Sequence, residues 1–299
     1  MIVRDALAAY RQQALSTQRR GAATYRSLLG LFEPAMVEDI LALTPAVVAA
    51  LIGRMEVGAP VHAHRARAYA APFFKWAVEN RLTPGNPLAL LPTPRAPSPR
   101  DRLLSLEELR LIWASLNGLG HPFGPAIGLL VLTGAYREDV AAMKLDELTR
   151  YANDRWTWRP GARGTAQDPH IVPLAAPAAR LIQASLANRP AGSPYVLSTT
   201  GKTPISGWSR VKRRLDGLVH DPDRGSAPLP PWRFNDIRLS FASLAVTELA
   251  IDEFVVERCL GRVSRYFSPL DRERAEGAGI LPQCRCAFER WADLIATGE

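Results

Sequence analysis

Residues 234–239, Phe-Asn-Asp-Ile-Arg-Leu, hold the combination of side chains that bears most directly on chemistry. The guanidinium of Arg238 is a planar fork that stays charged and can make two parallel hydrogen bonds to a phosphate. Asn235, three residues earlier, can donate a hydrogen bond but cannot exchange a proton near neutral pH. The segment can therefore supply a cation for a phosphate, whereas position 235 cannot serve as an acid or a base.

Together with Trp232 and residues 240–243, this segment resembles the box W-x-x-H-D-L-R-R-T-F-A-T of tyrosine recombinases, the phage integrase family. Arg238 falls on the family's second catalytic arginine, and Asn235 falls where the family has a histidine. Further landmarks follow in the family's order: residues 129–134 and 140–145 resemble the helix pair around the first arginine, 169–174 the end of the hairpin that carries the catalytic lysine, and 195–198 the strand after it. Ordered agreement over roughly two hundred residues is more specific than one short motif.

Cleavage of DNA by phosphoryl transfer to a tyrosine needs a phenolate nucleophile, cations on the phosphate oxygens, and groups that move protons. The resemblance implies two arginines, a lysine, two histidines and the tyrosine in these roles. Only Arg238 is retained. The substituted positions are Tyr136 for the first arginine, Thr165 for the lysine, Asn235 and Arg262 for the histidines, and Ala275 or its neighbour Arg274 for the tyrosine. The sequence therefore predicts a degenerate recombinase.

Three nearby residues are candidate stand-ins. Arg137 adjoins Tyr136, but one step along a helix turns a side chain by about 100°. Arg163 lies two residues before Thr165, which on a strand is the same face, although a loop arginine is also simply solvated. Tyr266 is the last tyrosine in the chain and follows Arg262 by four residues, so using it as the nucleophile requires the tail to be rethreaded. Its ordinary role is an aromatic anchor.

The proline-rich stretch 91–104 predicts a linker between two domains, residues 1–90 and 105–299. Helical spacing of apolar residues in 6–15, 45–55 and 63–80 predicts a helical bundle before the linker. The resemblance makes this a core-binding (SAM-like) domain and the rest a catalytic-type domain. It also implies that the two domains close around duplex DNA like a clamp.

After the linker, Ser105 and Glu108 form a capping-box pattern that predicts a helix from 105 to about 116. Residues 156–158 and 170–172 are expected to be the strands of a β-hairpin. The predicted fold class is thus mainly α with a small β-hairpin or sheet, in two domains.

Composition agrees with a nucleic-acid partner but does not establish one. The chain has 299 residues, 47% apolar and 22% charged, which is ordinary for a soluble globular protein. A net charge of +8 and a pI near 9.8 favour polyanions.

Several classes are disfavoured by pattern. Residues 1–20 contain Arg4, Asp5 and Arg11 where a signal peptide would be apolar. The longest apolar run, 123–135, is too short to span a bilayer, so a cytoplasmic protein without a membrane partner is expected. The three cysteines form neither a disulfide framework nor a zinc pair, and neither a metal nor a cofactor is predicted.

Affinity for duplex DNA comes mostly from neutralising phosphates and needs no catalytic tyrosine. The predicted contacts are Arg65, Arg67, Arg137, Arg163, Lys202, Arg210, Arg213, Arg214 and Arg262. Arg210, Arg213 and Arg214 share one helical face at i, i+3, i+4 spacing. The competing reading for each cation is a solvated surface, and for Arg238 it is a structural pair with a buried carboxylate such as Asp139.

Three functions are weighed. The first is a catalytically degenerate DNA-binding protein, derived from a mobile element or prophage, that occupies sites or regulates DNA integration and recombination. The second is an active site-specific recombinase with relocated catalytic residues. The third is an interaction protein that does not bind DNA and pairs with an active recombinase through the helix 284–296, where Phe288, Trp291 and Leu294 form an apolar stripe. Such a stripe also packs in its own core. The resemblance implies a homo-oligomer through the same C-terminal helix as a further alternative.

Overall fold

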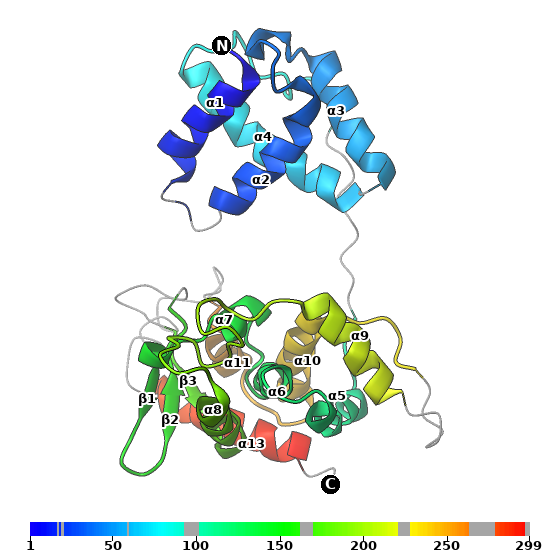
Figure 1. Cartoon of the computed structure of the whole chain (residues 1–299). Coiled ribbons are helices and arrows are strands. Elements are labelled where there is room, and N and C mark those ends of the chain that lie inside the picture. The colour runs from blue at the N-terminus through cyan, green and yellow to red at the C-terminus, as the bar shows by residue number, and fades with distance from the viewer. Residues whose placement is uncertain are drawn as a thin grey trace. The chain divides into compact units, whose positions relative to one another are not determined.

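The structure is a computed structural model that describes residues 1–16, 18, 21–58, 60–92, 102–161, 170–220, 228–262 and 279–296. The chain divides into two compact units, Met1–Arg100 (unit 1) and Asp101–Glu299 (unit 2), each with its own apolar core (Figure 1). No helix among the described residues is long and apolar enough to cross a membrane.

Unit 1 is helical. Its elements are α1 (Val3–Tyr10), η1 (Arg11–Leu15, a π-helix), α2 (Gly21–Phe32), η2 (Glu33–Ala35), η3 (Ile40–Ala42), α3 (Pro45–Gly58) and α4 (Pro60–Glu79). α4 packs against the three other α-helices, and Phe73 and Phe74 on it lie 5.7 and 5.8 Å from Phe32, ring centre to ring centre. All three rings are fully buried. The helices predicted from apolar spacing in this part of the chain are confirmed.

Unit 2 is built around a central apolar helix. Its elements are α5 (Leu106–Ala114), η4 (Leu116–Gly118), α6 (Phe123–Thr133), α7 (Arg137–Ala141), η5 (Leu145–Glu147), β1 (Leu148–Arg150), β2 (Trp156–Trp158), β3 (Val172–Leu174), α8 (Ala176–Asn188), α9 (Trp208–Val219), α10 (Phe234–Thr247), α11 (Glu253–Cys259) and α13 (Ile280–Ala296). Every residue of 126–133 in α6 is buried, as expected of a helix that is apolar on all sides. α5, α7, α8, α10 and α13 surround it (Figure 1).

The sheet of unit 2 is antiparallel with strand order β1-β2-β3. The predicted strand 156–158 is confirmed as β2. The predicted strand 170–172 is wrong by two residues, because β3 pairs Val172 with Trp158 and continues to Leu174. β1 was not anticipated.

Residues 195–198, expected to form a strand, make only one isolated bridge, between Tyr195 and Lys144. Here side chains compete with the backbone ladder. Ser193 Oγ accepts a hydrogen bond from the Tyr195 amide at 3.1 Å, and Ser198 Oγ accepts one from the Gly201 amide at 2.9 Å. Beside the bridge the Val196 amide donates to Met143 O at 2.9 Å, so the segment is a bent chain with one bridge and not a strand.

The C-terminal helix α13 uses its apolar stripe inside unit 2. Phe288 and Trp291 are buried, Leu294 is partly buried, and Trp291 Nε1 donates to Val131 O at 2.8 Å. The Phe241 ring stacks on Phe288 and makes an edge contact with Trp291. Of the two roles considered for this stripe, these contacts favour packing in the unit's own core.

Candidate functional site

Arg238 lies on α10 and is 3% exposed. Its Nη1 donates to Gly134 O at 2.8 Å, and its Nη2 donates to Leu260 O at 2.7 Å. Gly134 and Leu260 are the C-caps of α6 and α11. Carbonyls at helix C-termini lack intrahelical partners and bear partial negative charge, so a buried cation is well placed there. Arg238 therefore ties the ends of two helices to a third.

The ring of Tyr136 covers the guanidinium of Arg238. The distance from the ring centre to Arg238 Cζ is 4.0 Å, a cation–π contact. Tyr136 is the N-cap of α7, the position that the resemblance assigns to the first catalytic arginine. The structure thus brings together positions 136 and 238 of the predicted site, with an aromatic ring in place of a second cation.

The turn after α11 completes this region. Gly261 has a positive φ of 62°, and a Cβ built there would lie 2.6 Å from His170 Nδ1. His170 Nε2 lies 3.1 Å from Cys259 O and must donate, since a carbonyl only accepts. Arg262 forms an ion pair with Glu257 at 2.9 Å. The sequence placed His170 in the predicted hairpin but gave no sign that it would lie beside Gly261.

The remaining catalytic positions are either exposed or outside the described residues. Asn235 is exposed in the first turn of α10, one turn before Arg238. Outside the described ranges lie Arg163, Thr165, Tyr266, Arg274 and Ala275.

Besides Arg262, which pairs with Glu257, three of the described cations predicted to contact DNA are held by their own unit. Arg67 Nη2 donates to Leu91 O at 2.9 Å in unit 1. Arg214 Nη2 donates to Gly118 O at 2.7 Å in unit 2. Arg137 pairs with Glu138 at 2.7 Å, and its Cζ lies 5.8 Å from a Trp208 ring centre. Arg65, Lys202, Arg210 and Arg213 are exposed.

α9 is the most strongly amphipathic of the basic helices. Its buried face consists of Val211, Leu215 and Val219, and its exposed face presents Arg210 and Arg213. The start of the helix is fixed by Trp208, whose ring makes edge contacts with Phe123 and Phe234. The exposed cations are therefore presented on a rigid element.

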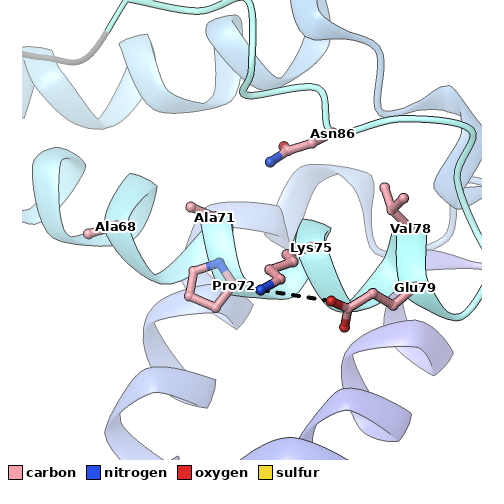
Figure 2. Close-up of a pocket in the computed structure, with 7 residues that line it drawn as sticks. All are labelled: Ala68, Ala71, Pro72, Lys75, Val78, Glu79 and Asn86. Atoms are coloured by element: carbon pink, nitrogen blue, oxygen red, sulfur yellow. Dashed lines mark ion pairs between the residues drawn. The ribbon is translucent and has the colours of Figure 1, made fainter.

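A hollow of about 850 Å³ lies on the outer face of α4 in unit 1 (Figure 2). It is lined by Ala68, Ala71, Pro72, Lys75, Val78, Glu79 and Asn86. Lys75 and Glu79 face each other 3.9 Å apart, so the charges in the lining compensate. The hollow has no group that suggests a reaction.

No protein-family model matches the sequence, and no curated protein matches it. Solved structures of tyrosine recombinases do match, and the chain has their fold.

A lambda integrase dimer bound to a COC′ core site has a TM-score of 0.62 and 17% identity, over 92% of this chain and 77% of that one. The Tn1549 transposon integrase in complex with circular intermediate DNA has a TM-score of 0.63 and 14% identity, over 92% and 99%. The XerH site-specific recombinase bound to its difH substrate, a pre-cleavage complex, has a TM-score of 0.59 and 16% identity, over 91% and 81%.

Proposed function

We propose that this protein binds double-stranded DNA with a tyrosine recombinase fold and does not cleave it. In this proposal it derives from a mobile element or prophage and occupies sites or regulates DNA integration and recombination. In this proposal the protein is cytoplasmic and is associated with the nucleoid when it is bound to DNA. The observation that supports the loss of catalysis most directly is the burial of Arg238 beneath Tyr136.

The contacts of Arg238 oppose a phosphate-binding role. Two of its N–H groups donate to backbone carbonyls, and one face of the guanidinium is against an aromatic ring. A hydrogen bond that involves a charged group contributes about 1.5–3 kcal/mol, and a cation–π contact contributes about 0.5–2 kcal/mol. Turning the guanidinium toward a phosphate would sacrifice these contacts. The contacts therefore favour the structural role considered for Arg238, while the pairing with Asp139 stays a prediction.

The rest of the pocket supports the same conclusion. Tyr136 brings no charge to the place of the first arginine, and Asn235 cannot act as a general acid or base near neutral pH. Arg262 is engaged with Glu257. Of the described residues, positions 136 and 235 therefore offer a transition state with developing charge on the phosphate neither a second cation nor a proton carrier.

DNA binding is supported by the fold and by charge. The similar structures are complexes with DNA. The net charge of +8 draws the chain toward a polyanion, and Arg65, Lys202, Arg210 and Arg213 are exposed for phosphate contacts.

The test measures binding of the full chain to a random-sequence duplex by fluorescence anisotropy at a series of salt concentrations. We expect the logarithm of the association constant to fall linearly with the logarithm of the salt concentration, by about 0.9 for each phosphate contacted. Absence of binding at low salt would contradict the proposal and favour the interaction protein that lacks DNA affinity.

A further inference from the structure

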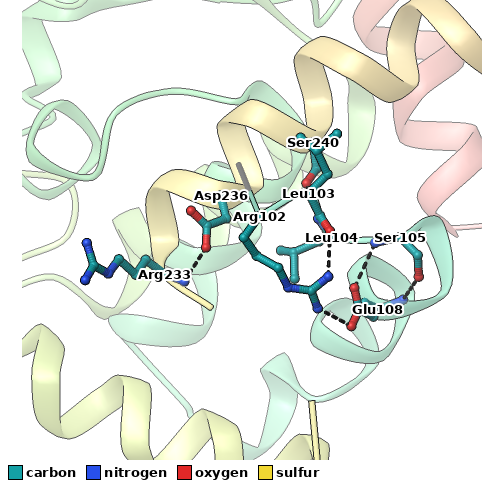
Figure 3. Close-up of polar contacts among 8 residues, drawn as sticks. All are labelled: Arg102, Leu103, Leu104, Ser105, Glu108, Arg233, Asp236 and Ser240. Carbon is teal, nitrogen blue, oxygen red and sulfur yellow. Dashed lines mark hydrogen bonds and ion pairs between the residues drawn. The ribbon is translucent and has the colours of Figure 1, made fainter. Parts of the chain in front are cut away.

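The chain enters unit 2 through residues 102–105, here called the strap, which lead into α5 and lie against α10 at Ser240 (Figure 3). Leu104 is 1% exposed within the core of unit 2. Its backbone N–H donates to Ser240 Oγ on α10 at 2.6 Å, and Ser240 is itself fully buried. The strap is therefore fixed to the helix that holds Arg238.

One carboxylate secures the other side of the strap. Glu108 Oε2 accepts from the Ser105 amide at 2.8 Å, which closes the predicted capping box together with the bond from the Glu108 amide to Ser105 Oγ at 3.1 Å. Glu108 Oε1 accepts from Arg102 Nη2 at 2.5 Å, and Arg102 Nη1 donates to Leu103 O at 2.7 Å (Figure 3). The Glu108 side chain is only 15% exposed, so this ion pair is partly shielded from water.

In unit 1, the chain is fastened at the opposite end of the proline-rich stretch. Arg67 Nη2 donates to Leu91 O at 2.9 Å, in a partly buried contact. Leu88 is 5% exposed, and Leu91 packs against the core of unit 1. Arg67 thus holds the segment that leads out of unit 1.

We propose that Arg67, Glu108 and Ser240 are positioning residues that fix both ends of the connection between the units. The inference rests on the proposed function, because the length of the connection matters when both units bind one duplex. From Pro92 to Arg102 there are ten Cα–Cα steps, so the connection reaches at most about 33–36 Å.

A connection with fixed ends responds asymmetrically to a change in length. When it is too short to join two binding sites, the effective concentration of the second unit falls to almost zero. When it is too long, the effective concentration falls only as about the −3/2 power of length. If the two ends of the connection could detach from their units, the released residues would lengthen it and compensate for a deletion.

Hydrogen exchange of the Leu104 amide in the DNA-free full chain tests the anchor in unit 2. Ser240→Ala removes the acceptor, and Glu108→Gln weakens the grip on the strap; each should accelerate exchange about fivefold or more. Glu107→Gln is the matched control, because Glu107 is an exposed carboxylate in the same helical turn. Unchanged exchange at Leu104 in Ser240→Ala would overturn the proposal.

Limited proteolysis of the full chain tests the anchor in unit 1. Arg67→Met should increase thermolysin cleavage next to Leu91 about fivefold, because the carbonyl loses its donor. Arg65→Met removes the same charge from an exposed position on the same helix and should leave the rate unchanged. Equal rates for the two variants would rule out Arg67 as an anchor.

Duplex affinity tests the consequence. Deletion of residues 96–99 should weaken binding at least tenfold while Leu104 stays protected, whereas insertion of four residues there should weaken it less than about twofold. A deletion that leaves affinity unchanged overturns the proposal, whether or not Leu104 becomes exposed. If the unaltered chain binds no duplex, the proposed function is wrong, and so is the proposal that the anchored connection supports DNA binding. Leu104 exchange would still report on the contacts themselves.

Discussion

Arg238 illustrates how a residue type suited to phosphate chemistry can become part of a core. A buried guanidinium needs acceptors, and the C-terminal carbonyls of α6 and α11 supply two at 2.8 and 2.7 Å. Tyr136 supplies an aromatic face where an arginine would repel the charge. Removal of the Arg238 side chain would lower the stability of the fold, because it leaves two buried carbonyls without these donors.

Replacement of Arg238 by methionine should therefore lower stability rather than DNA affinity. We expect Arg238→Met to reduce the free energy of unfolding by about 3 kcal/mol in urea titrations. Arg137→Met, at an exposed arginine near the same site, should change it by less than about 0.5 kcal/mol. Unchanged stability combined with a large loss of duplex affinity would show that Arg238 binds phosphate.

The cysteines should differ in reactivity by burial. Cys259 and Cys284 are buried and Cys286 is exposed. Burial raises the pKa of the Cys259 thiol, while a hydrogen bond from Cys259 lowers the pKa of the Cys284 thiol. Because solvent does not reach the two buried thiols, DTNB should react quickly with Cys286 alone in the native protein. Cys286→Ser should therefore abolish the fast phase of the reaction. Two fast thiols in the native protein would contradict this burial.

At the scale of elements, Gly261 sets the turn that presents the Leu260 carbonyl to Arg238. Its φ of 62° suits glycine, and the His170 ring occupies the space where a Cβ would lie. Gly261→Ala should lower the free energy of unfolding by at least about 2 kcal/mol. Gly217→Ala, in an open position of α9, should raise it by about 0.5–1 kcal/mol. Thermal unfolding of both variants tests this, and equal effects would contradict the close contact at Gly261.

Elements with strong local signals were predictable. The capping box of Ser105 and Glu108 predicts a helix start from residues that are close in the sequence, and it is formed as expected. β1 was missed because its three residues, Leu-Thr-Arg, are too few to establish a period. A strand was expected at residues 195–198 from the family resemblance; Val196 and Leu197 are buried as strand residues would be, but the segment forms only an isolated bridge.

The contacts of individual cations were not predictable in the same way. Arg67 and Arg214 both lie on basic helical stretches, which favoured phosphate contact. Their acceptors are 24 and 96 residues away in the sequence, and only the folded chain brings them near. Residue type and helical spacing identify a charged face, whereas tertiary structure decides which charges on it are already used.

At the scale of the whole molecule, we expect the exposed cations of α9 to contribute to DNA affinity. Arg210→Ala and Arg213→Ala should each weaken duplex binding and reduce the slope of the salt dependence by about 0.9. Arg180→Ala, an exposed cation on α8, is the control and should leave the slope unchanged. Equal salt-dependence slopes for all three variants would show that α9 does not contact the duplex.

The central claim, DNA binding without cleavage, is tested most directly with a nicked suicide duplex made from sequences that the protein selects out of a random pool. Cleavage of such a duplex traps the enzyme on DNA through a phosphotyrosine bond, which intact mass spectrometry detects. We expect a stable complex from which the protein is recovered with unchanged mass. A covalent adduct that disappears in Tyr266→Phe would contradict it and establish a working recombinase.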